Sequence, residues 1–339
     1  MTIKTKIAIN GFGRIGRNLF RLLLNHPTIE VAAINDIADA KTMAHLLKYD
    51  SIHGILQAEV SHTDDAIIVD GKPYSFLRNK DVADIDWAKY NVDIAIESTG
   101  RFKTLEDANK HIASGAKKVI LSAPPEDDRI KTIVLGVNEN ILDGTETVIS
   151  NASCTTNNAA PMMKIINELC GIEQAYITTV HSYTTDQSLH DQPHKDLRRA
   201  RGAAQSIVPT TTGAAKALTK IFPEFTGKIG GGGIRVPVPD GSLTDITCYV
   251  KREVSIEEIN AAFKAAAEGE LKGILAYTED PIVSVDILGN RNSCLFDAQL
   301  TSVIDKMVKV VGWYDNEIGY SSRLIDLVNL LGKPVIEKT

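Results

Sequence analysis

A cysteine and a histidine in this sequence are placed for nucleophilic chemistry. Cys154 lies in the hydroxyl-rich run 153–157 (SCTTN), and His181 ends an apolar, strand-like run over 176–180. A thiolate attacks carbonyl carbons far better than a neutral thiol, so a catalytic cysteine needs a base or a helix N-terminus beside it. Alone, the two residues are more often an inert buried thiol and a core histidine. Together they favour an activated nucleophile.

A glycine motif near the start of the chain predicts a dinucleotide site. Gly11, Gly13 and Gly16 stand between a strand-like run and a helical pattern, and Asp36 ends the next apolar run. Such glycines allow a tight turn and let the backbone approach a pyrophosphate, which the helix N-terminus attracts. An acid about 20 residues further on binds the adenosine ribose and repels a 2′-phosphate, so we expect NAD rather than NADP. A glycine turn without a ligand is the alternative, and it would not require the acid.

A bound NAD would accept a hydride, so the carbonyl that Cys154 attacks is predicted to be an aldehyde. Groups that could hold a phosphate on it follow in the second half of the chain. The segment 210–213 (TTTG) precedes a helical pattern and offers hydroxyls and amides at a helix N-terminus. Arg235 lies inside an apolar run, where it needs either a bound anion or a structural ion pair.

A basic cluster consists of Lys195, Arg198, Arg199 and Arg201. It could bind anions, or it could be a solvated face or form salt bridges between subunits. His190 and His194 nearby are separated by Pro193, so they do not share one regular helix. We therefore expect a solvated loop there and no metal site.

Composition limits the classes of protein that fit. The chain has 339 residues, which predicts two domains, and a net charge of −6, which argues against a dedicated nucleic-acid binder. No secretory signal and no apolar run of about 18 residues is visible, so we expect no membrane partner. Four cysteines without a CxxC pair fit a reduced, cytoplasmic setting.

The first half of the chain alternates short apolar runs with helical patterns. This βαβ order predicts an α/β domain with a Rossmann-type, doubly wound parallel sheet. Strands are expected at 6–10, 31–35, 66–70, 74–77, 93–97, 118–122, 132–136 and 147–149, with a hairpin turn at 70–72 and a helix over 107–114.

The second half has longer runs that often alternate, which predicts an α+β catalytic domain with a mostly antiparallel sheet. Strands are expected at 175–181, 234–238, 243–251, 293–300 and 307–314, and helices at 213–221, 255–268 and 317–331. A further helix is expected from Cys154 to Cys170, closed by Gly171, although Pro161 should kink or delay it. The boundary between the domains is expected near residue 150.

Six segments together resemble phosphorylating glyceraldehyde-3-phosphate dehydrogenase over essentially the whole chain. They are 9–17 (INGFGRIGR), 46–51 (LLKYDS), 97–102 (ESTGRF), 151–157 (NASCTTN), 179–184 (TVHSYT) and 313–317 (WYDNE). The resemblance implies an NAD-binding domain over 1–152, to which a C-terminal helix over 317–339 returns, and a catalytic domain over 153–316. It also implies a homotetramer in which segment 183–205 lies near a neighbouring subunit's cofactor.

The resemblance assigns roles residue by residue. Cys154 would be the nucleophile and His181 its base. NAD would contact Asn10, Gly11, Gly13, Arg14, Ile15, Gly16, Asp36, Ser122, Asn316 and Lys80, with Arg78 as the alternative to the last. The substrate phosphate and inorganic phosphate would be held by Ser153, Thr155, Thr184, Arg199, Thr212, Gly213 and Arg235.

The implied reaction converts D-glyceraldehyde 3-phosphate, NAD and inorganic phosphate to 1,3-bisphosphoglycerate in glycolysis or gluconeogenesis, through a thiohemiacetal and a thioester. The chain departs from the family pattern at Asn158, where a second cysteine is usual, at Gln192, where leucine is common, and in the glycine run 230–233. This run could loosen the strand that carries Arg235. The alternatives are an erythrose-4-phosphate dehydrogenase and an NAD-binding protein with a second role.

Overall fold

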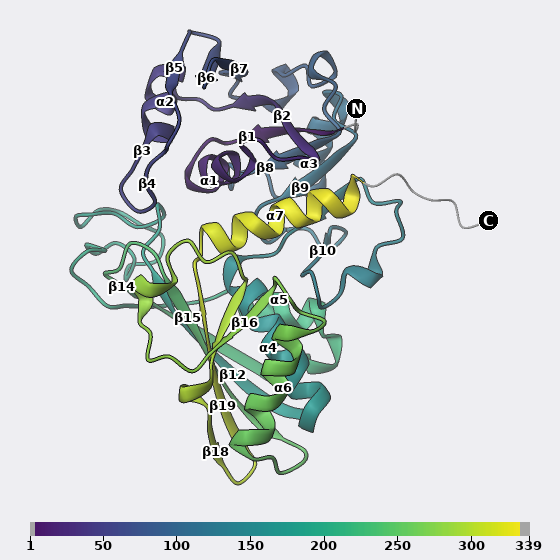
Figure 1. Cartoon of the computed structure of the whole chain (residues 1–339), viewed down its shortest axis with the longest axis vertical. Coiled ribbons are helices and arrows are strands. Elements are labelled where there is room, and N and C mark those ends of the chain that lie inside the picture. Colours follow the sequence, from purple (N-terminus) through teal and green to yellow (C-terminus); the bar gives the residue numbers. More distant parts are fainter. Residues whose placement is uncertain (1–3, 333–339) are drawn as a thin grey trace. The chain divides into compact units, whose positions relative to one another are not determined.

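The computed structural model describes residues 4–332 (Figure 1). Contacts divide these residues into two compact units. The first comprises 4–133, 139–152 and 321–332, and the second comprises 134–138 and 153–320. Of the C-terminal segment expected over 317–339, residues 333–339 lie outside the described part. Within the described part, no helix combines the length and the apolar character needed to cross a membrane.

The first unit is built on a nine-stranded sheet with the strand order β10-β11-β9-β8-β1-β2-β7-β6-β5. The strands are β1 (Thr5–Asn10), β2 (Ile29–Asn35), β5 (Val60–His62), β6 (Ala66–Val69), β7 (Lys72–Leu77), β8 (Ile94–Glu97), β9 (Lys118–Leu121), β10 (Lys131–Thr132) and β11 (Val148–Ser150). Only the pairs β5–β6 and β6–β7, at one end of this sheet, are antiparallel. The predicted doubly wound parallel sheet is therefore confirmed, as is the hairpin, whose turn residues Asp70 and Gly71 have φ of 49° and 78°.

Helices connect these strands. They are α1 (Arg14–Leu23), α2 (Ala40–Lys48), α3 (Leu105–Ala113) and the 3-10 helices Val82–Asp84, Ala88–Tyr90 and Glu139–Ile141; a separate ribbon pairs β3 (Tyr49–Asp50) with β4 (Gly54–Ile55). The prediction of a strand over 132–136 is wrong after Thr132, where β10 ends. Ile133 N still donates to Ser150 O, but the chain then turns, with Gly136 at φ 80° and the Asn138 side chain accepting from Val134 N.

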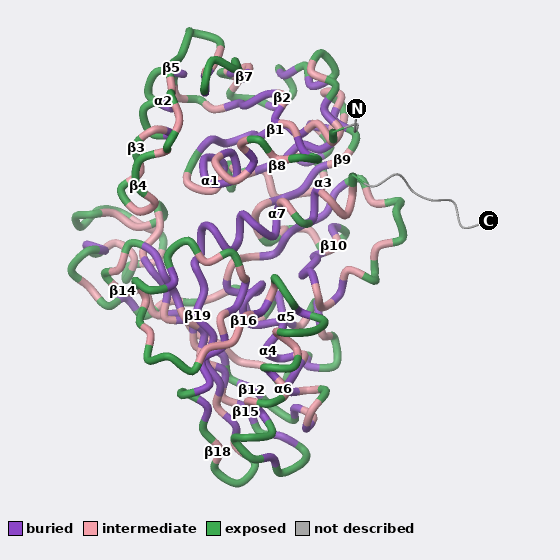
Figure 2. Tube along the Cα trace, viewed as in Figure 1, coloured by how far each residue is buried: buried purple, intermediate pink, exposed green. Residues whose placement is uncertain are grey.

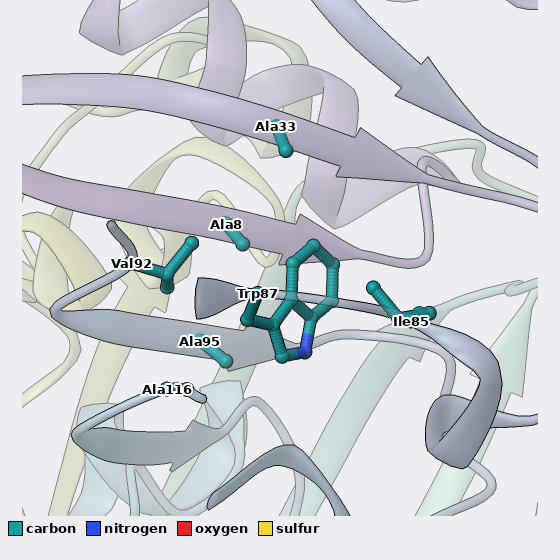
Figure 3. Packing of buried hydrophobic residues seen from close by; sticks show 7 residues of the cluster. All are labelled: Ala8, Ala33, Ile85, Trp87, Val92, Ala95 and Ala116. Atoms are coloured by element: carbon teal, nitrogen blue, oxygen red, sulfur yellow. The ribbon is translucent and has the colours of Figure 1, made fainter. Parts of the chain in front are cut away.

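The core of the first unit lies on both faces of the central strands, which are buried along most of their length (Figure 2). Trp87 is fully buried and fills the space above small residues of β1, β2 and β8 (Figure 3). These small residues are Ala8, Ala33 and Ala95. Because alanines leave room for one large ring, the indole fixes the spacing between this face of the sheet and the segment 85–92.

The second unit contains an eight-stranded sheet with the order β13-β14-β12-β15-β19-β17-β16, and β18 pairs with β19. The strands are β12 (Ile172–Ser182), β13 (Val208–Thr210), β14 (Ile229–Val236), β15 (Ser242–Val250), β16 (Leu275–Thr278), β17 (Cys294–Asp297), β18 (Ser302–Ile304) and β19 (Met307–Tyr314). The pairs β12–β14 and β16–β17 are parallel and the others antiparallel. The sheet is thus mixed and mostly antiparallel, as predicted.

Several strand boundaries in this unit differ from the prediction, and two of the differences have a clear consequence or cause. The strand expected at 234–238 begins at Ile229, so the glycine run 230–233 lies inside β14 rather than before it. The strand expected at 293–300 ends at Asp297, whose side chain accepts from Gln299 N and starts a 3-10 helix over Ala298–Leu300.

The remaining helices are α4 (Cys154–Cys170), α5 (Ala214–Ile221), α6 (Ile256–Glu268), α7 (Ile318–Leu331) and the 3-10 helices Pro223–Phe225 and Ser284–Ile287. Helix α4 packs on β15 and β19 and lies beside α5 and α6 (Figure 1). It continues through Pro161 without ending. Packing of its almost wholly buried residues against the sheet outweighs the one backbone hydrogen bond that the proline removes.

Candidate active site

Cys154 is the first residue of α4, so it lies at the helix N-terminus. Ser153 is the N-cap: its backbone is extended (φ −113°, ψ 165°), and its Oγ accepts a hydrogen bond of 3.1 Å from Thr156 N. Ala152, just before the cap, has φ 55°, a left-handed conformation that is strained for a residue other than glycine. This turn presents the half-buried thiol at the positive end of the helix dipole.

His181, near the end of β12, faces the thiol. Its Nε2 lies 3.4 Å from Cys154 Sγ. Its Nδ1 lies 2.8 Å from the carbonyl oxygen of Ser182 and 2.7 Å from Nη1 of Arg235. When Nδ1 carries the proton it donates to that carbonyl, and Nε2 accepts the thiol proton; in the other tautomer Nδ1 accepts from Arg235, and Nε2–H donates to a thiolate.

Burial and Arg235 govern the charges of this pair. Burial, reinforced by the positive charge of Arg235, lowers the pKa of His181 to about 3, so its imidazole is neutral at physiological pH. Burial also raises the pKa of the Cys154 thiol, while Arg235 and the backbone N–H of Thr155 oppose that rise. Without ligands, the site therefore holds a thiol and a neutral imidazole, and proton transfer between them must accompany attack.

Arg235 comes from β14, where the parallel register places it directly opposite His181. Its Nη1 also donates to Ser182 O at 2.8 Å. Within the described residues Arg235 forms no ion pair, so the structural ion pair that the sequence left open is not observed. A half-buried guanidinium without an anionic partner is able to bind an anion.

Arg199 is differently engaged. It forms ion pairs with Asp186 and Asp196, and its Nε donates to Thr210 Oγ1 at 2.9 Å. These ion pairs lie within the chain, so they are not the salt bridges between subunits that the sequence left open as an alternative. Burial lowers the pKa of the Arg235 guanidinium. Cys154 opposes this effect, and the positive charge of Arg199 adds to it. The positive charges of Arg199 and Arg235 are therefore close enough to repel each other.

The other expected phosphate ligands are placed less directly. Thr212 Oγ1 accepts from Ala214 N at 3.2 Å, and Gly213 is the N-cap of α5, so this segment does stand at a helix N-terminus. The side chain of Thr184 makes no hydrogen bond within the described residues. Thr155 Oγ1 contacts Tyr314 at 2.9 Å.

Tyr314 is a site residue that the reasoning from sequence missed. Its hydroxyl also lies 3.0 Å from Thr179 Oγ1, and its ring meets the His181 ring edge-on, with centroids 5.9 Å apart. Burial raises the pKa of this phenol, so it stays protonated and available as a hydrogen-bond donor. The only signal in the sequence was its place in the segment 313–317.

The predicted cofactor residues of the first unit gather at the carboxyl ends of its parallel strands. Gly11 has φ 98°, and a Cβ there would lie 2.6 Å from Thr99 N. A Cβ on Gly16 would lie 2.2 Å from Gly11 O, whereas one on Gly13 would meet nothing within 4 Å. Thus Gly11 and Gly16 fix a tight turn, and Gly13 leaves an open backbone surface of the kind that a pyrophosphate needs.

Asp36 lies directly beside this turn. Its Oδ2 accepts from Phe12 N at 2.7 Å and its Oδ1 from Ala38 N at 3.0 Å. Arg14, by contrast, is held in an ion pair with Asp50, and Lys80 makes no hydrogen bond or ion pair within the described residues. Asn10 and Ser122 lie at and just after the ends of β1 and β9. Ile15 lies in α1, and Asn316 belongs to the second unit.

A buried hydrogen-bond network behind the glycine turn was also missed. Glu97, at the end of β8, accepts from Asn10 Nδ2 at 2.6 Å, from Thr99 N at 2.8 Å and from His111 Nε2 at 3.1 Å. Trp87 Nε1 can only donate, so His111 Nδ1 accepts from it and Nε2 carries the proton. This network ties the ends of β1 and β8 together where the cofactor is expected.

A parallel dinucleotide-type sheet in one unit, and a cysteine–histidine pair beside Arg235 in the other, fit the class of NAD-dependent oxidoreductases. The family model described as the NAD-binding domain of glyceraldehyde 3-phosphate dehydrogenase matches residues 5–105, and the model of its C-terminal domain matches 153–316. The chain belongs to the glyceraldehyde-3-phosphate dehydrogenase family.

Curated relatives match nearly the full chain. Glyceraldehyde-3-phosphate dehydrogenase 2 of Streptomyces avermitilis is 58% identical over 335 residues, which cover 98% of this chain and 99% of the relative. Glyceraldehyde-3-phosphate dehydrogenase of Geobacillus stearothermophilus is 57% identical, over 95% of this chain and 96% of the relative. Glyceraldehyde-3-phosphate dehydrogenase 1 of Bacillus subtilis is 54% identical, covering 97% and 98%.

Proposed function

We infer that the chain catalyses the NAD-dependent, phosphorylating oxidation of D-glyceraldehyde 3-phosphate to 1,3-bisphosphoglycerate in glycolysis or gluconeogenesis. The observation that carries this inference is the row of three groups in the second unit. Cys154 Sγ lies 3.4 Å from one nitrogen of His181, and Arg235 Nη1 lies 2.7 Å from the other. A nucleophile, its base and a cation without an ion pair suit an aldehyde that carries a phosphate.

The residues of the chain divide the chemistry between them. His181 Nε2 accepts the thiol proton as Cys154 Sγ bonds to the aldehyde carbon, and it returns the proton to the oxygen, giving a thiohemiacetal. Bound NAD supplies the hydride acceptor. As the hydride leaves the carbon, His181 takes the hydroxyl proton, and a thioester on Cys154 remains. An oxygen of inorganic phosphate then attacks the thioester carbon, and the S–C bond breaks. The sulfur leaves as a thiolate and takes the proton back from His181, and the acyl phosphate is released.

The chain offers two places for anions in this scheme. Arg235 has no acidic partner among residues 4–332, and the segment 210–213 precedes α5, whose first backbone amides have no partner inside the helix. Arg199 interacts with both places, because its Nε donates to Thr210 Oγ1 and its charge acts on Arg235. We propose that these groups hold the substrate phosphate and the attacking phosphate, with Ser153, Thr155 and Thr184 as further ligands.

The residues of the first unit fit NAD. Gly11 and Gly16 leave no room for a side chain, Gly13 exposes backbone, and Asp36 follows β2 beside the turn. We propose that Asn10, Arg14, Ile15, Lys80 and Ser122 complete this site, and that Asn316 also contacts NAD. Arg14 would have to bind while paired with Asp50, through its backbone or its remaining donors.

The direct test is NADH formation by the full chain. With glyceraldehyde 3-phosphate and NAD, we expect turnover that depends on phosphate, and much slower turnover with erythrose 4-phosphate or with NADP. Cys154→Ser should lower the rate by about a thousandfold or more. Cys170→Ser, a buried cysteine whose Sγ only donates to Ile166 O, is the matched control and should stay active. Phosphate-independent turnover, or an active Cys154→Ser, would refute the inference.

We further propose a cytoplasmic homotetramer. Tyr176, Tyr249 and Ile304 are all more than half exposed, and the registers of β12, β15, β19 and β18 place them on one face of the sheet. An exposed apolar face of this kind suits a contact between copies of the chain. Light scattering after size exclusion should give four times the chain mass of 36.9 kDa; a monomer mass would contradict the proposal. Four free cysteines fit a reducing compartment.

A further inference from the structure

The amide of Asn316, just after β19, is held from one side only. Its Oδ1 accepts from Ser182 Oγ at 2.9 Å and from Ser242 Oγ at 2.7 Å. All three residues are at least nine-tenths buried, and all belong to the second unit. Within the described residues, the Nδ2 group donates to nothing.

Hydrogen-bond accounting decides which end of the amide faces the serines. Ser242 Oγ already accepts from Ser182 N at 3.1 Å, and both hydroxyl hydrogens find an acceptor in Asn316 Oδ1. If the amide were turned over, Nδ2 would donate to the two hydroxyl oxygens, and both hydroxyl hydrogens would be left without an acceptor. An unsatisfied buried donor is costly, so the orientation with Oδ1 toward the serines is strongly preferred.

The position of this amide connects it to the chemistry. Ser182 follows His181 in β12, and its carbonyl accepts from Arg235. Ser242 opens β15, the neighbouring strand. The locked amide thus contacts the residue that follows His181, and the proposed hydride transfer requires the nicotinamide of NAD to reach this end of the site.

We propose that Ser182 and Ser242 are positioning residues that fix Asn316 as a pure hydrogen-bond donor toward the cofactor, so that the site selects a carbonyl acceptor on the nicotinamide ring. The proposal rests on the proposed function. Neither serine touches substrate or cofactor in this scheme; each acts only by holding Oδ1. The selected group is the oxygen of the carboxamide, and its NH₂ plays no part in this contact.

The test compares two cofactors in two backgrounds. In thionicotinamide adenine dinucleotide, a sulfur that accepts hydrogen bonds poorly replaces the carboxamide oxygen, and the thioamide NH₂ donates better than an amide. We expect the preference for NAD over this analogue, measured as the ratio of kcat/KM values, to fall by about fivefold in the double variant Ser182→Ala/Ser242→Ala, because its amide can turn over. The intrinsic difference in reactivity between the cofactors cancels between the backgrounds.

Controls separate positioning from general damage. Ser293→Ala removes another buried hydroxyl of the second unit, one with no hydrogen-bond partner in the part of the chain that the structure describes, and should leave the ratio unchanged. The alkylation rate of Cys154 reports whether the site is intact, and each single serine variant should give an intermediate ratio if the double variant does not fold. An unchanged cofactor ratio in active variants would overturn the proposal while leaving the proposed function standing. A wild-type chain without activity would instead refute the proposed function.

Discussion

At the scale of single residues, one cation governs the reactivity of the cysteine–histidine pair. Arg235 opposes the effect of burial on the pKa of Cys154 and adds to the effect of burial on that of His181. A positive charge so placed favours the thiolate and disfavours the imidazolium. The pair therefore works as a thiol with a neutral base, and an anion bound at Arg235 would make His181 more basic.

This arrangement predicts the pH dependence of alkylation. Removing the guanidinium in Arg235→Gln takes away a charge that stabilises the thiolate, so the pKa of Cys154 should rise further. The midpoint of the iodoacetamide rate against pH should move up by about one unit. Arg201→Gln, which removes an exposed arginine paired with Asp191, should leave the midpoint in place. A downward shift in the Arg235 variant would contradict this account.

Tyr314 offers a second test at this scale. Tyr314→Phe keeps the ring beside His181 but removes the hydroxyl that contacts Thr155 and Thr179. The loss of these buried hydrogen bonds should lower the free energy of unfolding by about 1–2 kcal/mol, measured by urea denaturation. Tyr277→Phe, which removes an exposed contact with Glu279, should cost less than about 0.5 kcal/mol. Equal losses in the two variants would show that the buried hydrogen bonds of the Tyr314 hydroxyl do not stabilise the fold more than the exposed one of Tyr277.

At the scale of elements, glycines determine how closely strands and turns approach one another. In the first unit they form the turn between β1 and α1, and in the second they form half of β14. The glycine run 230–233 pairs in register with 176–179 of β12, so it is an ordered part of the sheet that positions Arg235. The expected loosening of this strand is not seen in its pairing.

Substitution of Gly16 and of Gly13, in the turn between β1 and α1, should have different effects on stability and on NAD binding. Gly16→Ala puts a Cβ 2.2 Å from a backbone oxygen and should lower the free energy of unfolding by several kcal/mol, to the point of poor folding. Gly13→Ala meets nothing, so its stability should be unchanged while its affinity for NAD falls by about tenfold or more. Calorimetry with and without NAD measures both quantities. Full NAD affinity in Gly13→Ala would place the pyrophosphate elsewhere.

Strand β14 allows a similar comparison. A Cβ on Gly231 would lie 3.0 Å from Ile177 O and 3.2 Å from the Cβ of Ala215, whereas one on Gly233 would make ordinary contacts at 3.5 Å or more. Gly231→Ala should therefore destabilise the chain by about 1–2 kcal/mol. Gly233→Ala should stabilise it by up to about 1 kcal/mol, because glycine in a strand carries an entropic cost. Thermal unfolding of the pair checks the sign of each change.

At the scale of the whole molecule, the sequence predicted what local patterns encode. The glycine turn, Asp36 at the end of β2 and the start of α4 at Cys154 were foreseen because each depends on neighbouring residues. The contact between His181 and Arg235 was not foreseen. It depends on β14 pairing in parallel with β12 across 54 residues, and no local pattern specifies that choice. Tyr314 and the Glu97 network escaped for the same reason, since their partners are distant in sequence.

The proposed mechanism depends on a thioester on Cys154 that is cleaved by phosphate rather than by water. We would mix the full chain with NAD and glyceraldehyde 3-phosphate without phosphate and follow NADH from the first turnover, then add phosphate. The account predicts a burst of about one NADH per chain that then nearly stops, and steady turnover once phosphate is present. Steady NADH formation from the start without phosphate, or no burst before phosphate is added, would contradict it.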